Sequence, residues 1–277
     1  MKQYPPFSVS MCVYGKDDPA FFDMAVESIV QQTVPPNEIV LAVDGPIPEC
    51  IQTVIEKYRK KMTMISFQVI YLERNMGHGE ARRVSFEHCT HELIALMDAD
   101  DLSVPERFQK QLACFAADPE LDIVSGIIQE FVDTPEKTVG KRIVPQSDGE
   151  IKEYMKRRCP MNQVAVMFRK RAVEQAGGYL DWYCDEDYYL WIRMALAGKK
   201  FANVPDVLVN VRVGKEMYSR RGGWKYFESE AKLQRLMLKK NMISPGRYGI
   251  NVAQRLALQV LMPNRLRGLL FRKLARS

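Results

Sequence analysis

The stretch that decides the fold is "LIALMDADDLSVPERFQKQ", residues 93–111. Five consecutive apolar residues are followed at once by a group of carboxylates, Asp98, Asp100 and Asp101. A short apolar run with an abrupt end indicates a buried strand, and ligands of open α/β sheets bind at the carboxyl ends of the strands. Asp98 and Asp100 are two residues apart, so in an extended segment their side chains share a face. The stretch therefore predicts a strand end that holds a ligand.

Apolar runs alternate with helical patterns on both sides of this stretch. Strands are expected at 7–14, 38–45, 67–73, 92–98 and 122–131, and helices at 19–32, 49–62, 79–89 and 105–117. This alternation is typical of βαβ units and predicts an α/β fold with a mostly parallel central sheet flanked by helices. The second half is less regular, with a helix expected at 185–197, a strand at 206–213 and a helix at 223–240.

Two interpretations of the acidic cluster are open. Pro105 suits the first turn of a helix, and Asp101 or Ser103 is the expected helix cap. Capping needs only one such residue, however, and leaves the pair Asp98 and Asp100 unexplained. Mg²⁺ and Mn²⁺ prefer oxygen ligands, often one or two carboxylates together with substrate phosphates. The pair is therefore expected to hold Mn²⁺ or Mg²⁺, which would neutralise a diphosphate that the carboxylates alone would repel.

Composition limits the class of protein. The 277 residues are 47% hydrophobic and 27% charged, as in a globular protein of one large or two small domains. No apolar run reaches the roughly 18 residues of a membrane span. The start, "MKQYPPFSVSMCVYG", does not have the pattern of a signal peptide, so a cytoplasmic location is expected. The six cysteines are scattered without a C-x-x-C pair, which favours buried thiols over disulfides or a zinc site.

Charge is distributed unevenly along the chain. The net charge is +6, yet no Asp or Glu follows Glu230, and residues 231–277 contain 11 Lys and Arg. The first 230 residues hold 29 basic against 34 acidic residues, a net charge of −5. We therefore expect two regions, an enzyme-like domain at 1–230 and a basic amphipathic C-terminal helical region at 231–277.

The C-terminal region has the pattern of an interfacial helix. On a helical wheel of residues 250–262 the polar side chains share one arc, namely Asn251, Gln254, Arg255 and Gln259. The opposite arc is apolar and holds Val252, Ala253, Leu256 and Val260. After Pro263, arginines again cluster apart from leucines. The pattern favours an anionic membrane surface as partner; the alternative is a packing helix with a solvated basic face. No nucleic acid is expected, because the body is acidic and no binding motif accompanies the tail.

Several motifs together resemble one enzyme family. They are "FSVSMCVYG" at 7–15, "VDG" at 43–45, "RNMGHGEARR" at 74–83, "MDADD" at 97–101 and "DEDYYLWIRMALAG" at 185–198. In this order they resemble family 2 glycosyltransferases, which have the GT-A fold and use nucleotide-diphosphate sugars. Residues 159–179 and 217–230 resemble the members that build bacterial O-antigen, capsule and exopolysaccharide of the amylovoran type. The resemblance covers residues 7 to about 240.

For the donor, the resemblance implies a nucleoside pocket lined by Tyr14, in which Asp44 hydrogen-bonds the base, expected to be uracil. Asn75 and Gly77 would shape the edge of this pocket. Arg82 would lie near the diphosphate, although a solvated helix charge is the alternative interpretation. The sequence reads "VDGP" where the family more often has "VDDGS", so only one acid remains after the second strand.

For the chemistry, the resemblance implies that Asp100 is the direct metal ligand and that Asp98 contacts ribose or metal. Asp187 would be the base that takes the acceptor proton, and Glu186 would orient it or touch the acceptor. The alternative for these two acids is a helix N-terminus enriched in carboxylates for its dipole. One base on one face implies single displacement with inversion.

Two further features near these motifs are weaker signals. Arg212, Arg220 and Arg221 flank a Gly pair, and such a loop is expected either to close over the donor diphosphate or to grip an acceptor phosphate. A solvated basic loop is the alternative. His78 in the "GHG" loop is, as a lone histidine, weak evidence for a ligand.

The expected function is therefore a metal-dependent, inverting hexosyltransferase. It would transfer glucose or galactose from a UDP-sugar to a polyprenyl-diphosphate-linked saccharide, at the inner face of the cell membrane, in surface polysaccharide synthesis. A sugar nucleotidyltransferase is one alternative, but its Gly-rich basic loop is replaced by "YGKDDPAFFD" at 14–23. A non-catalytic membrane-associated scaffold of the same fold is the other.

Overall fold

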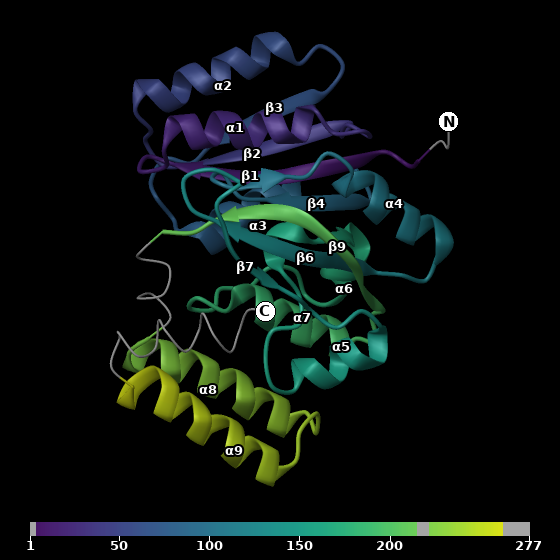
Figure 1. The fold of residues 1–277 in the computed structure, drawn as a ribbon, viewed down its shortest axis with the longest axis vertical. Helices are drawn as coiled ribbons and strands as arrows, with labels where there is room; N and C mark the ends of the chain where they lie inside the picture. Colours follow the sequence, from purple (N-terminus) through teal and green to yellow (C-terminus); the bar gives the residue numbers. More distant parts are fainter. Residues whose placement is uncertain (1–3, 215–221, 263–277) are drawn as a thin grey trace.

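The computed structural model describes residues 4–214 and 222–262. One sheet runs through this part of the chain, with strands in the order β3-β2-β1-β4-β8-β6-β9-β5 and β7 paired to β6 (Figure 1). The strands are β1 Phe7–Tyr14, β2 Glu38–Asp44, β3 Ser66–Tyr71, β4 Leu93–Met97, β5 Leu102–Ser103, β6 Ile123–Phe131, β7 Thr138–Arg142, β8 Met167–Arg169 and β9 Phe201–Arg212.

Helices cover both faces of this sheet. They are α1 Pro19–Val30, α2 Glu49–Lys61, α3 His78–His88, α4 Arg107–Ala117, α5 Asp148–Met155, α6 Lys170–Gln175, α7 Glu186–Leu196, α8 Trp224–Lys239 and α9 Pro245–Arg255. The last continues as the π-helical turn Leu256–Leu261, and a 3₁₀ turn spans Gln163–Ala165. Helices α1, α2 and α4 bury apolar side chains in one core cluster, and α3, α5, α6, α7 and α8 do so in another.

The parallel part of the sheet fixes the candidate site. Strands β1, β2 and β4 are nearly all apolar and buried, as expected for strands covered on both faces. They pair in parallel, with Tyr14 opposite Asp44 and Met11 opposite Met97. Because parallel strands end at the same edge, the polar residues that follow β1, β2 and β4 meet there.

The second half of the sheet is mixed. β6 and β9 are parallel, whereas β8 runs antiparallel to both β4 and β6, and β5 runs antiparallel to β9. The expected strand at 206–213 is confirmed but begins earlier, at Phe201.

The prediction that Asp101 or Ser103 caps the helix after β4 is wrong. That helix, α4, begins at Arg107 after Glu106, without a side-chain cap. Asp101 instead accepts a hydrogen bond from the backbone N–H of Arg212, at 2.8 Å.

Helices α8 and α9 form a hairpin at the foot of the molecule (Figure 1). Of the polar arc expected on residues 250–262, Asn251, Arg255 and Gln259 are buried against the body, whereas Gln254 is exposed. Asn251 donates to the carbonyl of Lys156 at 2.8 Å and to Gln234 at 2.7 Å. Arg255 donates to the carbonyl of Arg157 at 2.7 Å. Of the apolar arc, Ala253 is exposed and Val252, Leu256 and Val260 are half-buried. Outside this arc, Ile250 is 58% and Leu261 71% exposed.

The regional division expected at residue 230 falls inside α8 and stays a prediction. The arginine cluster expected after Pro263 lies outside the described residues. Within the described part of the chain, no helix combines the length and apolarity needed to cross a membrane.

Candidate active site at the strand ends

Asp44, at the end of β2, organises the loop that leads into α3. Its two carboxylate oxygens accept hydrogen bonds from the backbone N–H groups of Met76, at 2.6 Å, and Gly77, at 3.0 Å. The next residue, Gly45, has φ of 84°, and a Cβ there would lie 2.5 Å from the backbone N of Asn75. Only glycine allows this approach, so the loop is held tightly against the end of β2.

The residues predicted to line the nucleoside pocket lie together around this loop. The amide of Asn75 donates to the carbonyl of Asp44 at 3.4 Å. Tyr14 ends the neighbouring strand with its side chain exposed. Gly77 is bound to Asp44 as described, and it directly precedes α3. The structure thus brings Tyr14, Asp44, Asn75 and Gly77 to one edge, and their contacts to a base stay predictions.

Arg82 is a buried partner of Asp98. Its side chain is 1% exposed, so the alternative of a solvated helix charge is wrong. Its Nη2 donates to Asp98 Oδ1 in a short charged hydrogen bond. Burial alone would raise the pKa of Asp98, but the charge and hydrogen bond of Arg82, together with nearby His78, hold that pKa well below its usual range. Asp98 is therefore an anion at neutral pH.

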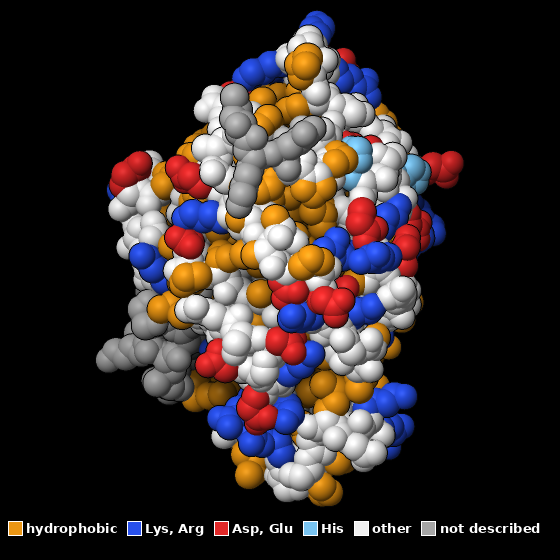
Figure 2. Space-filling view, turned by 90° about the vertical axis from the view of Figure 1, so that its right-hand side faces the viewer, with side chains coloured by type: hydrophobic (Ala, Val, Ile, Leu, Met, Phe, Trp, Pro, Cys, Tyr) orange, Lys and Arg blue, Asp and Glu red, His pale blue; other side chains and the backbone are white. Residues whose placement is uncertain are grey.

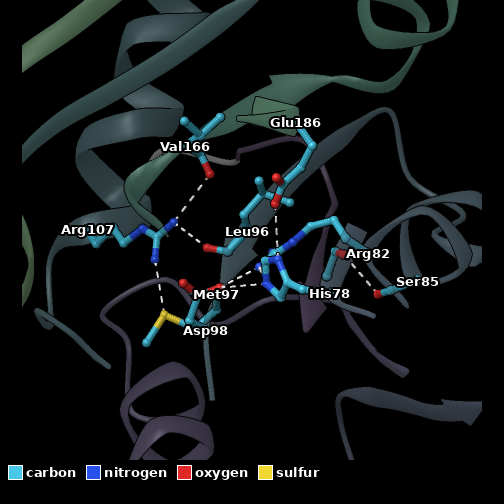
Figure 3. A network of polar contacts seen from close by, with 10 residues as sticks. His78, Arg82, Ser85, Leu96, Met97, Asp98, Arg107, Val166 and Glu186 are labelled. Carbon is cyan, nitrogen blue, oxygen red and sulfur yellow. Dashed lines mark hydrogen bonds and ion pairs between the residues drawn. The ribbon is translucent and has the colours of Figure 1, made fainter. Parts of the chain in front are cut away.

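His78 connects the two halves of the site (Figure 3). Its Nε2 lies 2.9 Å from Arg82 Nη2 and 3.8 Å from Asp98 Oδ1, and its Nδ1 lies 3.3 Å from Glu186 Oε1. Partial burial and the charge of Arg82 oppose protonation, but the neighbouring carboxylates of Asp98 and Glu186 raise the pKa of His78 to about 9. His78 thus joins a strand end to the start of α7, with 48% of its side chain exposed at the site.

The two acids predicted for catalysis begin α7. Glu186 and Asp187 are its first residues, and no side chain caps the helix. Burial would raise the pKa of Glu186, but the hydrogen bond from His78 lowers it. Asp187 Oδ1 accepts from the backbone N–H of Tyr188 at 2.7 Å, and Oδ2 lies 3.8 Å from the Cys159 thiol. The structure therefore places Glu186 against His78 at the donor edge, with Asp187 next to it in the sequence, and the roles of both acids stay predictions.

Carboxylates concentrate where a cation is expected. Asp100 is exposed just after β4, with Asp98 half-buried beside it. Asp17, in the loop after β1, has its pKa raised to about 6, first by burial and then by the charges of Asp100 and Asp98. In the described ranges no group of three His, Cys, Asp or Glu side chains could hold a metal alone. Asp98 and Asp100 fit an ion that is completed by phosphate oxygens or water, as is usual for Mg²⁺.

Arg212 holds the segment that carries these acids. Its guanidinium donates to the carbonyls of Asp100, at 3.2 Å, and Asp133, at 2.9 Å. It also lies 3.7 Å from the ring centroid of Phe21. These contacts fix the loop after β4, and the predicted phosphate contact of Arg212 stays a prediction. Arg220 and Arg221 lie outside the described residues.

Asp17 was not predicted from the sequence, and His78 was considered only as weak evidence for a ligand. Asp17 is one of two adjacent acids directly after the first strand, and that position is itself a signal in a sheet whose strand ends converge. His78 contacts Glu186, which is 108 residues away, and no local pattern announces such a pair.

The geometry can be compared with that of known proteins. Residues 8–176 match the model of glycosyl transferase family 2. The chain is 38% identical to the amylovoran biosynthesis glycosyltransferase AmsE of Erwinia amylovora, over 84% of this chain and 85% of that protein. It is 35% identical to the Escherichia coli UDP-Gal:alpha-D-GlcNAc-diphosphoundecaprenol beta-1,3-galactosyltransferase, over 98% of this chain and 97% of that protein.

Solved structures show the same fold. The mannosyltransferase PcManGT from Pyrobaculum calidifontis, in complex with GDP-Man and Mn²⁺, has a TM-score of 0.67 at 16% identity, covering 99% of this chain and 77% of that one. TarS 1–349 of S. aureus, in complex with UDP-GlcNAc, has a TM-score of 0.65 at 18% identity, covering 91% of this chain and 72% of that one. The expected GT-A fold is confirmed. The match over more than half of its length shows that this chain belongs to glycosyl transferase family 2.

Proposed function

We propose that the protein is an inverting hexosyltransferase that uses a UDP-sugar, with galactose or glucose as the transferred hexose. The acceptor is a saccharide linked through a diphosphate to a polyprenyl lipid, in the synthesis of a bacterial surface polysaccharide. Support comes from the similarity along nearly the whole chain to a galactosyltransferase named for a GlcNAc-diphosphoundecaprenol acceptor. A glycosyltransferase of amylovoran synthesis is also similar over most of its length.

The observation that carries the proposal is the contact between the donor edge and the start of α7. Asp98 follows β4, Glu186 begins α7, and His78 lies within hydrogen-bond or ion-pair distance of both (Figure 3). A transferase needs this juxtaposition, because the sugar–phosphate bond must lie between the nucleotide-binding groups and the acceptor base. A protein that only binds nucleotides has no need for the second set of acids.

The proposed chemistry is a single displacement. The acceptor hydroxyl attacks the anomeric carbon, the bond from that carbon to the diphosphate oxygen breaks, and UDP leaves with the electron pair. Asp187 accepts the hydroxyl proton. Arg82 keeps positive charge next to Asp98, and His78 contacts Glu186 and holds it in place. An α-linked donor would then give a β-linked product, and an α linkage found by NMR of the product would exclude this mechanism.

Asp98 and Asp100 would hold the divalent ion. Mn²⁺ or Mg²⁺ bound there would stabilise the charge that develops on the departing diphosphate. The acidic surroundings support this assignment, because the charges of Asp98 and Asp100 already raise the pKa of nearby Asp17. A cation between these carboxylates would lower that pKa.

The α8–α9 hairpin is the proposed membrane contact. Exposed basic residues lie at the C-terminal end of α8, namely Arg235, Lys239 and Lys240, and Ile250 and Leu261 are exposed on the second arm. Figure 2 shows hydrophobic and basic side chains together at the foot of the molecule, where the hairpin lies. Such a surface suits an anionic lipid leaflet. Ile250→Asp should weaken sedimentation with phosphatidylglycerol vesicles, whereas Met64→Asp, at an exposed apolar residue after α2, should not.

The first experiment on function measures UDP release from a panel of UDP-sugars, with Mn²⁺ or EDTA, on the wild type and Asp100→Ala. A synthetic GlcNAc-diphosphate-lipid serves as acceptor. UDP release with one of the UDP-sugars supports the proposal if that release requires the metal and is lost in Asp100→Ala. If no sugar gives release, calorimetry of UDP binding decides: binding points to a different acceptor, and its absence contradicts the donor site. A chain that binds UDP but never transfers would fit the scaffold alternative.

A further inference from the structure

A second pocket lies beside the acids of α7, away from the strand ends. It has a volume of about 330 Å³, within the range of roughly 300–1,000 Å³ of small-molecule sites. It lies between the segment before α7 and the first half of α8, and its lining residues are Asp181, Trp182, Tyr183, Lys225, Glu228, Ser229 and Lys232. None of the groups assigned to the donor lines it.

The aromatic side chains of this pocket are held in fixed positions. Trp182 packs against Tyr189 with the ring planes tilted by 39° and the centroids 4.3 Å apart, and its indole N–H donates to the carbonyl of Ser229 at 3.4 Å. Tyr183 is 44% exposed, and the ammonium of Lys225 lies 4.0 Å from its ring centroid. A tyrosine held in this way offers a ring face or edge to a ligand at small entropic cost.

The charges of the pocket select between ligand classes. Two lysines and two carboxylates, Lys225, Lys232, Asp181 and Glu228, line it, so the lining has no net charge. A diphosphate would be favoured by an excess of positive charge. A sugar is neutral, and its hydroxyl groups both donate and accept hydrogen bonds, while its C–H faces suit an aromatic ring. The lining therefore matches a saccharide better than a phosphate.

The wall of the pocket is hydrogen-bonded to the segment that leads into the predicted base. Ser229, in its wall, donates from Oγ to the carbonyl of Tyr183 at 2.6 Å. Asp185 is two residues after Tyr183 and Asp187 is four residues after it, with Cys184 at a φ of 59° forming the sharp bend between. A ligand on Tyr183 therefore lies close to the start of α7. The same α8 continues into the hairpin that we assign to the membrane.

We propose that this pocket is the subsite for a sugar residue of the acceptor saccharide, and this inference rests on the proposed transferase function. Tyr183 supplies the stacking surface, and Glu228 and the two lysines hydrogen-bond the hydroxyl groups. An acceptor sugar held here is presented to Asp187 from the side of the hairpin, while the donor occupies the strand ends.

The test compares Tyr183→Ala and Glu228→Gln with a matched control, Tyr154→Ala, at a tyrosine that lines a different pocket on α5. The acceptor is GlcNAc-diphosphate with an alkyl chain, and alkyl diphosphate without the sugar serves as a competing probe. We expect Tyr183→Ala to raise the acceptor KM by about tenfold and to leave the KM for the UDP-sugar within about twofold. The inhibition constant of the alkyl diphosphate should not change.

Two outcomes would overturn the inference. One is an unchanged acceptor KM in both pocket variants, and the other is an equal loss of affinity for alkyl diphosphate, which would assign the pocket to phosphate. If the wild type transfers no sugar, the proposed function fails separately. Saturation-transfer NMR of GlcNAc-diphosphate-alkyl on the wild type and Tyr183→Ala still decides the inference, since signals from the sugar ring must weaken in the variant.

Discussion

Asp185 should make the protein less stable as pH rises, and Asp185→Asn should remove this dependence. The side chain is 6% exposed, and its Oδ2 has no hydrogen-bond partner among the described residues. Burial, followed by the charges of Glu230 and Asp187, raises the pKa of Asp185 to about 8. The folded protein therefore keeps a proton that the unfolded chain releases at about pH 4.

The direction and size of this change in the free energy of unfolding follow from proton linkage. Between about pH 4 and 8 the folded state binds more protons than the unfolded state, so the free energy of unfolding falls as pH rises. One pH unit corresponds to about 1.4 kcal/mol, so the loss between pH 4 and 7 reaches up to about 4 kcal/mol. Asparagine resembles the protonated acid and carries no such penalty. The variant should therefore be more stable than the wild type at pH 7.5 and nearly equal to it at pH 4.5.

Urea unfolding followed by circular dichroism at four pH values from 4.5 to 8 measures this effect. The quantity of interest is the stability of the variant minus that of the wild type, because other groups that titrate cancel in the difference. Glu120→Gln, at an exposed carboxylate, is the control and should give a flat difference. A flat or falling difference for Asp185→Asn would show that the carboxyl ionises without cost, and the reasoning from burial would be refuted.

Three further changes test separate parts of the structure. Gly45→Ala should lower the free energy of unfolding by at least about 2 kcal/mol in urea titrations. The reason is that φ of 84° is strained for alanine and that its Cβ would lie 2.5 Å from the backbone N of Asn75. An unchanged free energy of unfolding would contradict the tight packing of this loop. His78→Ala should lower kcat by about tenfold to a hundredfold, because Glu186 would lose the contact that positions it. The affinity for UDP, measured by calorimetry, should stay nearly unchanged. A change in UDP affinity without a change in kcat would argue against a positioning role. Asn251→Ala should lower the free energy of unfolding, measured in urea, by about 1–3 kcal/mol, because Gln234 and the Lys156 carbonyl lose their hydrogen-bond partner. An unchanged free energy of unfolding would mean that the polar face of α9 is solvated.

The sequence allows the parallel half of the fold to be predicted because each of its strands is a separate apolar run. The expected strand at 7–14 and helix starts at Pro19, Glu49 and near 185 agree closely with the structure. The short strands β5 and β8 have two and three residues, too few for a pattern, and β7 is mostly exposed. Helix α5 had a readable signal, since Ser147 and Glu150 form a capping box.

The candidate site was predictable where it depends on strand ends and not where it depends on contacts between distant segments. Asp44 and Asp98 each follow an apolar run, so their convergence could be expected from topology. The burial of Arg82 could not, because a helical arginine has the same sequence pattern whether it faces solvent or a carboxylate. The bridge from His78 to Glu186 likewise arises from the packing of α3 against the start of α7.

The polar inner face of α9 has a practical consequence for shortening the chain. Glu230 is ion-paired with Arg255 at 3.2 Å and accepts a hydrogen bond from Gln259, and Glu230 is also a charge that acts on Asp185. A protein truncated after residue 242 would lose both Arg255 and Gln259. Glu230 would then keep its negative charge without these partners, close to Asp185, which directly precedes the predicted catalytic acids. Any loss of turnover in such a fragment would then report altered electrostatics at the start of α7 as well as detachment from lipid. A cut after residue 262 leaves these contacts in place and separates the two effects.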